Sequence, residues 1–570
     1  MLKRLLVSLI IVAALYTRFV GLDWGLPYPM HPDERNMAVS LMNLTCPTIT
    51  ALQECLHPHF FAYGQFPLYL GYAIVLGSKF IRLDSSPISF TEATIALRTI
   101  SALSSLLLLY SLYRLTQKLL SKSRFAFLAI LTVLSLAIYS PFLIQSAHFG
   151  TTETFLMLLY CEIVRISIGL KKKGKRLTWG YCGALLGIAI ATKVSALQFG
   201  LIPFVVWIRL FDRKHYIRWL GNGLALLLMG GVAYVVSSPH NVISYKEFFG
   251  SIYYELAVGR GLYKAFYTRT FDDTVPMIFQ LHSVLPYALG FGSALLGTVS
   301  MIVLTWRNAK LNLLRVALML PLLSSVFLYA KWTRFSILSL PLIYVFIALM
   351  VESYYSSVCK RRSYAFLVPF VLTGFYAMIS GIAYLSIYRN SDTRVRASEW
   401  IYQHVLPHSV ILSETANVVD VPLTLDQGHH LGSYKYISFD FYNLDTKLQL
   451  QHDLRTYLAQ ADYIVVPSRR LFANHTCMRP ANSRLGSIRG YLSDVCAKRE
   501  ALYPQLHNYY ETLFTSGNYE KVAEFTSYPQ IQLFGHMVFS VPDEFAEETW
   551  SVFDHPVVRI YKRKTSAGFL

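Results

Sequence analysis

The sequence predicts an all-α protein that crosses a membrane many times and carries a smaller α/β domain at its C-terminal end. Of its 570 residues, 54% are hydrophobic and only 15% are charged, and the mean hydropathy is +0.40. Soluble proteins carry about 25% charged residues. Apolar runs recur through the first two thirds of the chain, and the hydropathy falls after residue 390. Together these observations exclude an ordinary soluble protein.

The formal net charge of +19 raises the possibility of a nucleic-acid partner. The positions of Lys and Arg along the chain distinguish nucleic-acid binding from a membrane topology. These residues fall in short clusters between the apolar runs, which is typical of cytoplasmic loops. A long basic tail and a Gly-rich RNA-binding signature are both missing from the sequence. We therefore expect membrane lipids, and no nucleic acid, as partners.

The N-terminal stretch "MLKRLLVSLIIVAALYTRFV" resembles a signal peptide, because two basic residues precede an apolar core. A small-x-small cleavage site does not follow it. We expect an uncleaved first membrane helix with a cytoplasmic N-terminus.

The apolar runs and the basic clusters together predict the topology. Runs begin near residues 5, 67, 98, 125, 152, 178, 197, 219, 281, 313, 335 and 364. If every run crossed, basic clusters such as 171–176 and 213–218 would face outward, against the positive-inside rule. The run at 66–83 is short, contains Gly and opens with Phe-Pro. If it lies along the membrane surface instead, every basic cluster becomes cytoplasmic and about eleven spans remain.

This topology divides the chain into two predicted domains. Residues 1–389 form the transmembrane domain, with outer loops at 21–97 and 238–280. Residues 390–570 form an extracytoplasmic domain. In that domain, "ASEWIYQHVLPHSVILSETA" and "LRTYLAQADYIVVPSRR" each predict a helix followed by a strand, and this alternation is typical of a small α/β domain.

The predicted topology places the seven cysteines in different locations relative to the membrane. Cys46 and Cys55 share the first outer loop, and Cys477 and Cys496 share the outer domain. Each pair could form a disulfide in an oxidising compartment, although free thiols remain the alternative.

Most of the unusual polar residues fall at the predicted outer face. Ionisable groups at this depth are costly and often functional. Singly, each has a structural explanation: a basic residue can snorkel to the interface, Glu153 can stabilise a helix N-terminus, and His148 can be a packing residue. Together they suit a reaction on an anionic, lipid-linked substrate. The candidates are His31, Asp33, Glu34, Arg98, His148, Glu153, Lys193, Glu255, Arg260, Lys331 and Arg334.

The order of several motifs resembles a known family. "HPDE" after the first span is followed by "YGQFPLYL", "ALRTISAL", "SAHFGTTETF", "ATKVSAL" and "TRFSILSLP". This order is similar to that in GT-C glycosyltransferases, and most similar to the branch of protein O-mannosyltransferases and aminoarabinose transferases, including its bacterial and archaeal members. The resemblance covers roughly residues 5–390, and the acid pair is its most specific element.

The resemblance implies roles for the matching residues. Asp33 would be the catalytic base, Glu34 its neighbour in the motif, and Glu153 the second acidic position, where relatives often have Asp. Relatives often carry a Lys before the prolines near the lipid phosphate; Gln65 stands there in this chain, so Lys193, Arg334 or Arg98 would have to bind phosphate. The remaining candidates, His31, His148, Glu255, Arg260 and Lys331, are expected to line the substrate site.

A metal is not favoured, although a divalent ion is possible. The oligosaccharyltransferase relatives hold one with an Asp-x-Asp motif, whereas "TTET" supplies one carboxylate. We expect no other cofactor.

The predicted function is therefore transfer of a sugar from a polyprenyl-phosphate donor to an acceptor hydroxyl of a protein, lipid or polysaccharide. The enzyme would lie in the cell membrane, act on its outer side and invert the anomeric carbon. Two alternatives remain: a lipid or glycan transporter, for which charges at mid-membrane and an internal repeat are expected, and a non-catalytic assembly subunit.

Overall fold

A computed structural model describes residues 2–46, 53–120, 123–361, 368–414, 420–423, 434–478, 480, 492–515 and 517–564. The chain forms two compact units. The first unit, here the membrane unit, comprises residues 1–22, 33–259 and 279–385. The second comprises residues 23–32, 260–278 and 386–570; we call it the outer-domain unit after the predicted domain that makes up most of it. Two further basic clusters of the predicted cytoplasmic side are 118–124 and 360–362; of these, residues 121, 122 and 362 lie outside the described residues.

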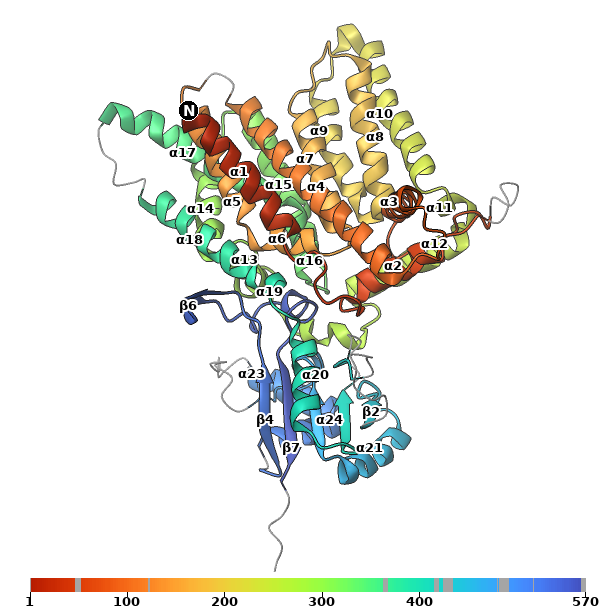
Figure 1. The fold of residues 1–570 in the computed structure, drawn as a ribbon. Helices are drawn as coiled ribbons and strands as arrows, with labels where there is room; N and C mark the ends of the chain where they lie inside the picture. Colours follow the sequence, from red (N-terminus) through yellow and green to blue (C-terminus); the bar gives the residue numbers. More distant parts are fainter. Residues whose placement is uncertain are drawn as a thin grey trace, which may run out of the picture. The chain divides into compact units, whose positions relative to one another are not determined.

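The membrane unit consists of helices, and the apolar ones run beside one another as long rods (Figure 1). Its α-helices are α1 (Leu2–Phe19), α2 (Pro32–Met42), α3 (Phe66–Arg82), α4 (Phe90–Leu119), α5 (Ala126–Ile138), α6 (Pro141–His148), α7 (Glu153–Ser167), α8 (Arg176–Thr192), α9 (Leu201–Arg209), α10 (Tyr216–Ser237), α11 (His240–Ile243), α12 (Tyr245–Arg260), α13 (Leu285–Ala288), α14 (Phe291–Val303), α15 (Ala309–Val326), α16 (Thr333–Ser336), α17 (Pro341–Arg361) and α18 (Val368–Tyr384). Short 3₁₀ or π turns join some of them, including η1 (Val194–Gly200), η4 (Gln280–Val284) and η5 (Ile337–Ser339).

The predicted membrane protein is confirmed at the level of its apolar helices. Among the described residues, four helices are long and apolar enough to cross a membrane, and up to seven spans result if each strongly bent helix pair counts as one. One bent pair joins 126–138 to 141–148, where Pro141 starts the second helix. Because of such breaks, hydropathy runs and observed helices do not correspond one to one.

Two helices were predicted in or beside the first outer loop. The predicted bounds of the first agree with the structure, whereas the second begins earlier than predicted. The run at 66–83 forms α3, a helix of 17 residues with Pro67 in its first turn. The next helix, α4, begins at Phe90 rather than near residue 98. Ser89 and Glu92 form a reciprocal capping box at its start, and this polar turn lies outside the apolar run that predicted the span.

Close packing of small residues joins α8 to α10. A Cβ added at Gly183 would lie 2.0 Å from the Leu226 carbonyl oxygen, and one at Gly187 would lie 2.2 Å from the Gly230 carbonyl oxygen. Glycine is therefore required at both positions for the backbones to approach this closely. This pairing fixes the direction of α8, whose last turn leads into the candidate site.

The outer-domain unit is the predicted α/β domain, built on a five-stranded sheet in the order β2-β1-β3-β7-β4. Strands β1 (Val410–Glu414), β2 (Lys435–Phe439) and β3 (Tyr463–Val466) are parallel, while β7 (Val558–Arg563) and β4 (Tyr519–Phe525) add antiparallel neighbours. A separate hairpin pairs β5 (Gln530–Leu533) with β6 (His536–Ser540). The helices of this unit are α19 (Ser386–Arg389), α20 (Thr393–His404), α21 (Leu448–Gln460), α22 (Arg470–His475), α23 (Leu492–Leu502), α24 (Pro504–Phe514) and α25 (Glu548–Ser551).

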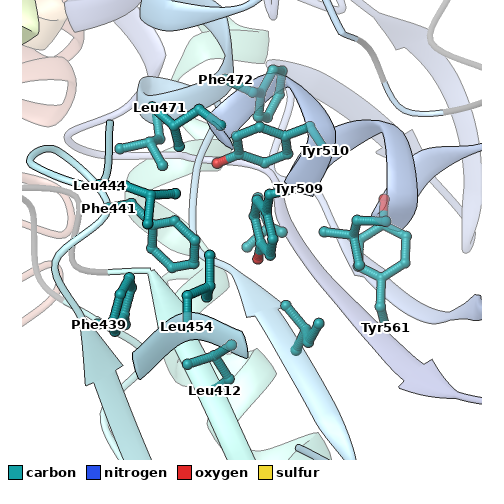
Figure 2. Close-up of a cluster of buried hydrophobic side chains, with 14 of the residues drawn as sticks. Leu412, Phe439, Phe441, Leu444, Leu454, Leu471, Phe472, Tyr509, Tyr510 and Tyr561 are labelled. Carbon is teal, nitrogen blue, oxygen red and sulfur yellow. The ribbon is translucent and has the colours of Figure 1, made fainter. Parts of the chain in front are cut away.

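Side chains from the sheet and its helices fill the core on one side of this sheet. Leu412 and Phe439 come from neighbouring strands, Leu471 from α22, and Tyr509 and Tyr510 from α24; all are buried (Figure 2). A second buried cluster includes Ile401 of α20 and Ile411 of β1, so the alternation of helix and strand in the sequence produces an α/β unit with two packed hydrophobic clusters.

Two segments far from residue 390 join the outer-domain unit. In the first, the Arg394 guanidinium donates to the Met30 carbonyl oxygen at 3.3 Å, and the His31 ring lies 4.3 Å from that of Phe553. In the second, the Thr270 N–H donates to the Asn474 side chain at 2.8 Å. The unit is therefore larger than the predicted segment 390–570.

The structure contains the two cysteine pairs considered above as disulfides, Cys46–Cys55 and Cys477–Cys496. Cys161 and Cys182 are free and buried within helices.

Candidate active site

The acid pair occupies the first turn of α2 in the membrane unit. Pro32 begins the helix, and Asp33 and Glu34 follow it directly. Proline suits this position because its missing N–H would have no partner in the first turn, and carboxylates are favoured there by the helix dipole. Local sequence therefore explains why both acids lie at a helix start, although their environments differ.

Glu34 is buried and accepts hydrogen bonds from Arg98 and Gly150. We call these three residues the Glu34 clamp. Arg98 donates through Nε at 2.9 Å and Nη2 at 2.7 Å to the two carboxylate oxygens, and the Gly150 N–H donates at 2.6 Å. The Glu34 side chain is 2% exposed and that of Arg98 is 0% exposed. The clamp joins α2, α4 and the turn before α7.

Asp33 keeps access to solvent. Its side chain is 23% exposed and forms an ion pair with Arg334, which is 22% exposed. Arg334 Nη1 also donates to the Tyr63 hydroxyl oxygen at 3.0 Å. Burial raises the pKa of Tyr63 well above its usual value, so this hydroxyl stays protonated and can itself donate a hydrogen bond.

A second ion pair lies beside the first. Glu153 begins α7, and its carboxylate lies 3.3 Å from Lys193 Nζ. Lys193 directly follows α8, where the backbone becomes extended. The Lys193 ammonium also lies 5.0 Å from the centre of the Tyr63 ring and 5.4 Å from that of Phe335, within the range of cation–π attraction.

The loop carrying Tyr63 is fixed by its contact with the end of α8. The Gly64 N–H donates to the Thr192 carbonyl oxygen at 2.9 Å, and a Cβ at Gly64 would lie 1.6 Å from the Ala191 carbonyl oxygen. Only glycine can approach the helix end this closely. This contact places Tyr63 next to Lys193.

We call Asp33, Tyr63, Glu153, Lys193 and Arg334 the acid–base cluster. Glu255 of α12 is exposed and interacts electrostatically with Asp33, Lys193 and Arg334 at its edge. The cluster thus combines a partly exposed carboxylate with two cations and a protonated hydroxyl. Such a set can accept a proton and stabilise an anion at one place.

Other predicted candidates lie apart from this cluster. Arg98 belongs to the Glu34 clamp. His148 is fully buried, and its ring nitrogens lie 2.8 and 2.9 Å from the carbonyl oxygens of Ile144 and Val20. Lys331 is buried and donates to the Tyr329 carbonyl oxygen at 3.2 Å.

The two remaining candidates belong to the outer-domain unit. His31 packs on Phe553, as described above, and Arg260 is exposed at the end of α12. The sequence predicted both as substrate-binding residues, in the same site as the expected base Asp33.

Sequence reasoning also missed aromatic members of the site. Tyr63 and Phe335 face Lys193, and the Arg334 guanidinium lies 4.7 Å from the centre of the Trp332 ring. In the quoted motifs Tyr63 is next to Gly64 and Phe335 is next to Arg334, and this adjacency was the signal that could have identified them.

Within the residues that the structure describes, no group of three or more His, Cys, Asp or Glu side chains is placed to hold a metal ion.

Comparison with known proteins gives one family match. Residues 88–243 match the sequence model of the family described as dolichyl-phosphate-mannose-protein mannosyltransferase. These residues include Arg98, Glu153 and Lys193. No curated protein sequence matches the chain significantly.

Several solved structures are similar to this chain at low identity. ArnT from Cupriavidus metallidurans bound to undecaprenyl phosphate has a TM-score of 0.45 and 12% identity, with 82% of this chain and 93% of that one covered. The apo oligosaccharyltransferase of Archaeoglobus fulgidus has a TM-score of 0.42 and 12% identity, with 82% and 71% covered. A mycobacterial arabinofuranosyltransferase, AftD, has a TM-score of 0.34 and 13% identity, with 99% and 42% covered. These scores are too low to support conclusions about this chain by themselves.

The family match confirms the resemblance to GT-C glycosyltransferases. Over residues 88–243 the chain is therefore similar to a family of membrane glycosyltransferases, as its motifs predict.

Proposed function

We propose that this enzyme takes a sugar from a polyprenyl-phosphate donor and transfers it to an acceptor hydroxyl at the outer membrane face, with inversion. The observation that carries the proposal is the acid–base cluster. Its partly exposed carboxylate and two cations match the two needs of the reaction, a base for the acceptor and positive charge for the leaving phosphate. The family that matches residues 88–243 has such a lipid-phosphate sugar, dolichyl-phosphate-mannose, in its description.

In this proposal Asp33 is the base. The acceptor oxygen attacks the anomeric carbon while its proton moves to the Asp33 carboxylate. The bond between that carbon and the phosphate oxygen breaks, and its electron pair leaves with the lipid phosphate. Attack on the face opposite the leaving group inverts the anomeric carbon.

Arg334 and Lys193 hold the phosphate. In the structure described here Arg334 pairs with Asp33, which stabilises the carboxylate and makes it a weaker base. A bound phosphate would compete for Arg334 and draw it from Asp33. The donor would thereby restore basicity to Asp33 only when a sugar is present to be transferred.

Glu153 positions Lys193 through their ion pair, and Tyr63 positions Arg334. Glu34 and Arg98 act as structural residues that fix α2 against α4. His148 and Lys331, engaged with backbone carbonyls, have no proposed contact with substrate.

The finer topology is part of the same proposal. The N-terminus would be cytoplasmic, about eleven segments would cross, and α3 would lie along the outer surface. Cysteines placed singly at the exposed positions of this segment, 85–87, 89 and 91, should react with an impermeant reagent from the outside only. Labelling from the cytoplasm would contradict this topology.

The decisive test supplies purified protein with a panel of polyprenyl-phosphate sugars and measures release of polyprenyl phosphate. We expect release with at least one donor, and a decrease of about 10²- to 10⁴-fold in Asp33→Asn. Asp84→Asn is the matched control, because Asp84 pairs with Lys79 in the same predicted outer loop and lies outside the cluster. Equal activity in Asp33→Asn and the control would refute the assignment of Asp33.

Repeating the assay with a chelator tests the proposed independence from metal ions. Release should continue at the same rate. Loss of release on chelation, restored by a divalent ion, would overturn that part of the mechanism.

A further inference from the structure

The β5–β6 hairpin of the outer-domain unit presents an apolar surface to solvent. Its sequence, "QIQLFGHMVFS", contains no Asp, Glu, Lys or Arg. Four of its apolar residues are strongly exposed: Leu533 at 53%, Phe534 at 100%, Met537 at 64% and Val538 at 63%. Among the described strands, β5 and β6 pair with each other and with no third strand, and β6 lies apart from β4 and β7 in Figure 1. A patch of this kind indicates an interaction site.

The turn at the tip strengthens this interpretation. Leu533 pairs with His536, so Phe534 and Gly535 form a two-residue turn with φ of +51° and +82°. Such turns favour Asn, Asp or Gly, because other residues resist positive φ. A phenylalanine there is unfavourable locally, and full exposure gives it no compensating burial within the chain. The Phe534 side chain is therefore available to a surface outside the chain.

The base of the hairpin indicates what covers the tip. The Gln530 N–H donates to the Ser386 hydroxyl at 3.2 Å. Ser386 follows the last apolar helix, α18, by two residues, and residues 368–389 form a candidate membrane span. Chain continuity therefore attaches the hairpin base to the end of a membrane helix.

The length of the hairpin is sufficient to reach lipid. Three steps from Gln530 to Leu533 span about 10 Å at ~3.3 Å per residue. The headgroup layer on each side of the hydrocarbon core is roughly 5–8 Å thick. A hairpin directed from the end of α18 into the membrane would bring the Phe534 ring to the edge of the acyl chains. Aromatic rings are enriched at this depth.

We propose that the β5–β6 hairpin is a membrane-inserting element that binds the lipid surface through Leu533, Phe534, Met537 and Val538. The ligand is the acyl-chain boundary of the leaflet that α18 reaches, and binding requires no specific headgroup because the hairpin carries no charged group apart from a protonatable His536. This anchor would limit the movement of the outer-domain unit at its connection to the last span. The proposal is independent of the enzyme's reaction.

The test uses the full-length protein in nanodiscs of phosphatidylcholine with a polarity-sensitive fluorophore on a single cysteine. Phe534→Cys reports the tip, and Met537→Cys reports the same surface with Phe534 intact. Leu448→Cys is the matched control, because Leu448 is an apolar residue of the same unit, 81% exposed at the start of α21. Cys359 is replaced by Ser, while buried Cys161 and Cys182 are checked for absence of labelling.

We expect labels at positions 534 and 537 to be quenched by lipids with a spin label near the top of the acyl chain and protected from iodide in water. The label at 448 should behave in the opposite way. Iodide quenching at all three positions would overturn the proposal. Protection from iodide without quenching by the lipids would also overturn it, since a protein surface would then cover the hairpin.

Discussion

Asp33 and Glu34 are neighbours in sequence and in the same helical turn, yet their surroundings give them different capacities. Both face an arginine, but the Asp33 side chain is 23% exposed and the Glu34 side chain 2%. Glu34 also accepts a backbone N–H from Gly150. A buried carboxylate with fixed donors holds elements together, whereas one that keeps access to solvent can exchange its proton with a substrate. We therefore expect Glu34 to hold helices together and Asp33 to take part in the reaction.

The largest expected effect on stability comes from breaking the Glu34 clamp. Arg98→Ala leaves Glu34 buried without its cation, and this should destabilise the membrane unit by about 3–5 kcal/mol. The double variant Arg98→Met with Glu34→Gln removes both charges and should recover much of the loss. Thermal unfolding in detergent measures both. Equal stability of Arg98→Ala and wild type would show that the clamp has no structural role.

A second buried carboxylate, that of Glu414 in the outer-domain unit, differs from Glu34 in its hydrogen-bond partner. Glu414 ends β1, is fully buried, and accepts a hydrogen bond from the Tyr509 hydroxyl at 3.1 Å where Glu34 has an arginine. Burial raises the pKa of Glu414 to about 8. A raised carboxyl pKa in the folded state contributes stability that is complete below about pH 4.5 and is lost as the pH rises toward 8.

The outer-domain unit should therefore lose on the order of a few kcal/mol of stability across this pH window. Glu414→Gln should flatten the profile below pH 6.5, because its side chain does not ionise. Above that pH a second decline should remain, since neighbouring Asp543 and Asp554 outweigh burial and raise the pKa of His555 to about 10. Hydrogen exchange of β1 and β3 amides as a function of pH measures this profile. A profile unchanged by Glu414→Gln would contradict the assignment.

Gly150 tests how closely the clamp must fit. A Cβ there would lie 2.8 Å from the Leu97 Cβ and 3.1 Å from a Glu34 carboxylate oxygen. Gly150→Ala should cost about 1–3 kcal/mol through overpacking. Gly77→Ala is the matched control, because a Cβ at Gly77 in α3 meets open space. Similar unfolding midpoints for the two variants would show that the turn adjusts freely.

The smallest expected effect concerns phosphate binding by the acid–base cluster. Lys193→Gln should raise the donor KM by roughly tenfold, equivalent to ~1.4 kcal/mol. The assay is compared per folded molecule, because buried Glu153 loses its cation in this variant. Lys193→Arg should retain most of the affinity because it keeps the charge. Lys331→Gln provides the control, since Lys331 lies outside the acid–base cluster and donates to a backbone carbonyl. An unchanged KM in Lys193→Gln would remove Lys193 from the donor site.

Several elements could be predicted because they depend on local sequence. The run at 66–83 became α3 over Phe66–Arg82, and the helix–strand pairs after residue 390 became α20–β1 and α21–β3. Periodicity and caps act within a few residues, so the sequence alone is sufficient there.

The composition of the site was only partly predictable. Asp33, Glu153, Lys193 and Arg334 were expected together, but Tyr63 was missed because its position depends on Gly64 packing against α8, far along the chain. His148 was expected in the site because hydropathy does not reveal which way a histidine side chain points. Segments 23–32 and 260–278 join the outer-domain unit through non-local contacts that no local pattern predicts.

The most direct test of the central claim is a single-turnover measurement on Asp33→Asn with bound donor. The account predicts that this variant binds polyprenyl-phosphate sugar as wild type does but releases polyprenyl phosphate about 10²- to 10⁴-fold more slowly. Glu34→Gln, compared per folded molecule, should release it at close to the wild-type rate. Release by Asp33→Asn at the rate of Glu34→Gln would contradict the division of labour between the two acids.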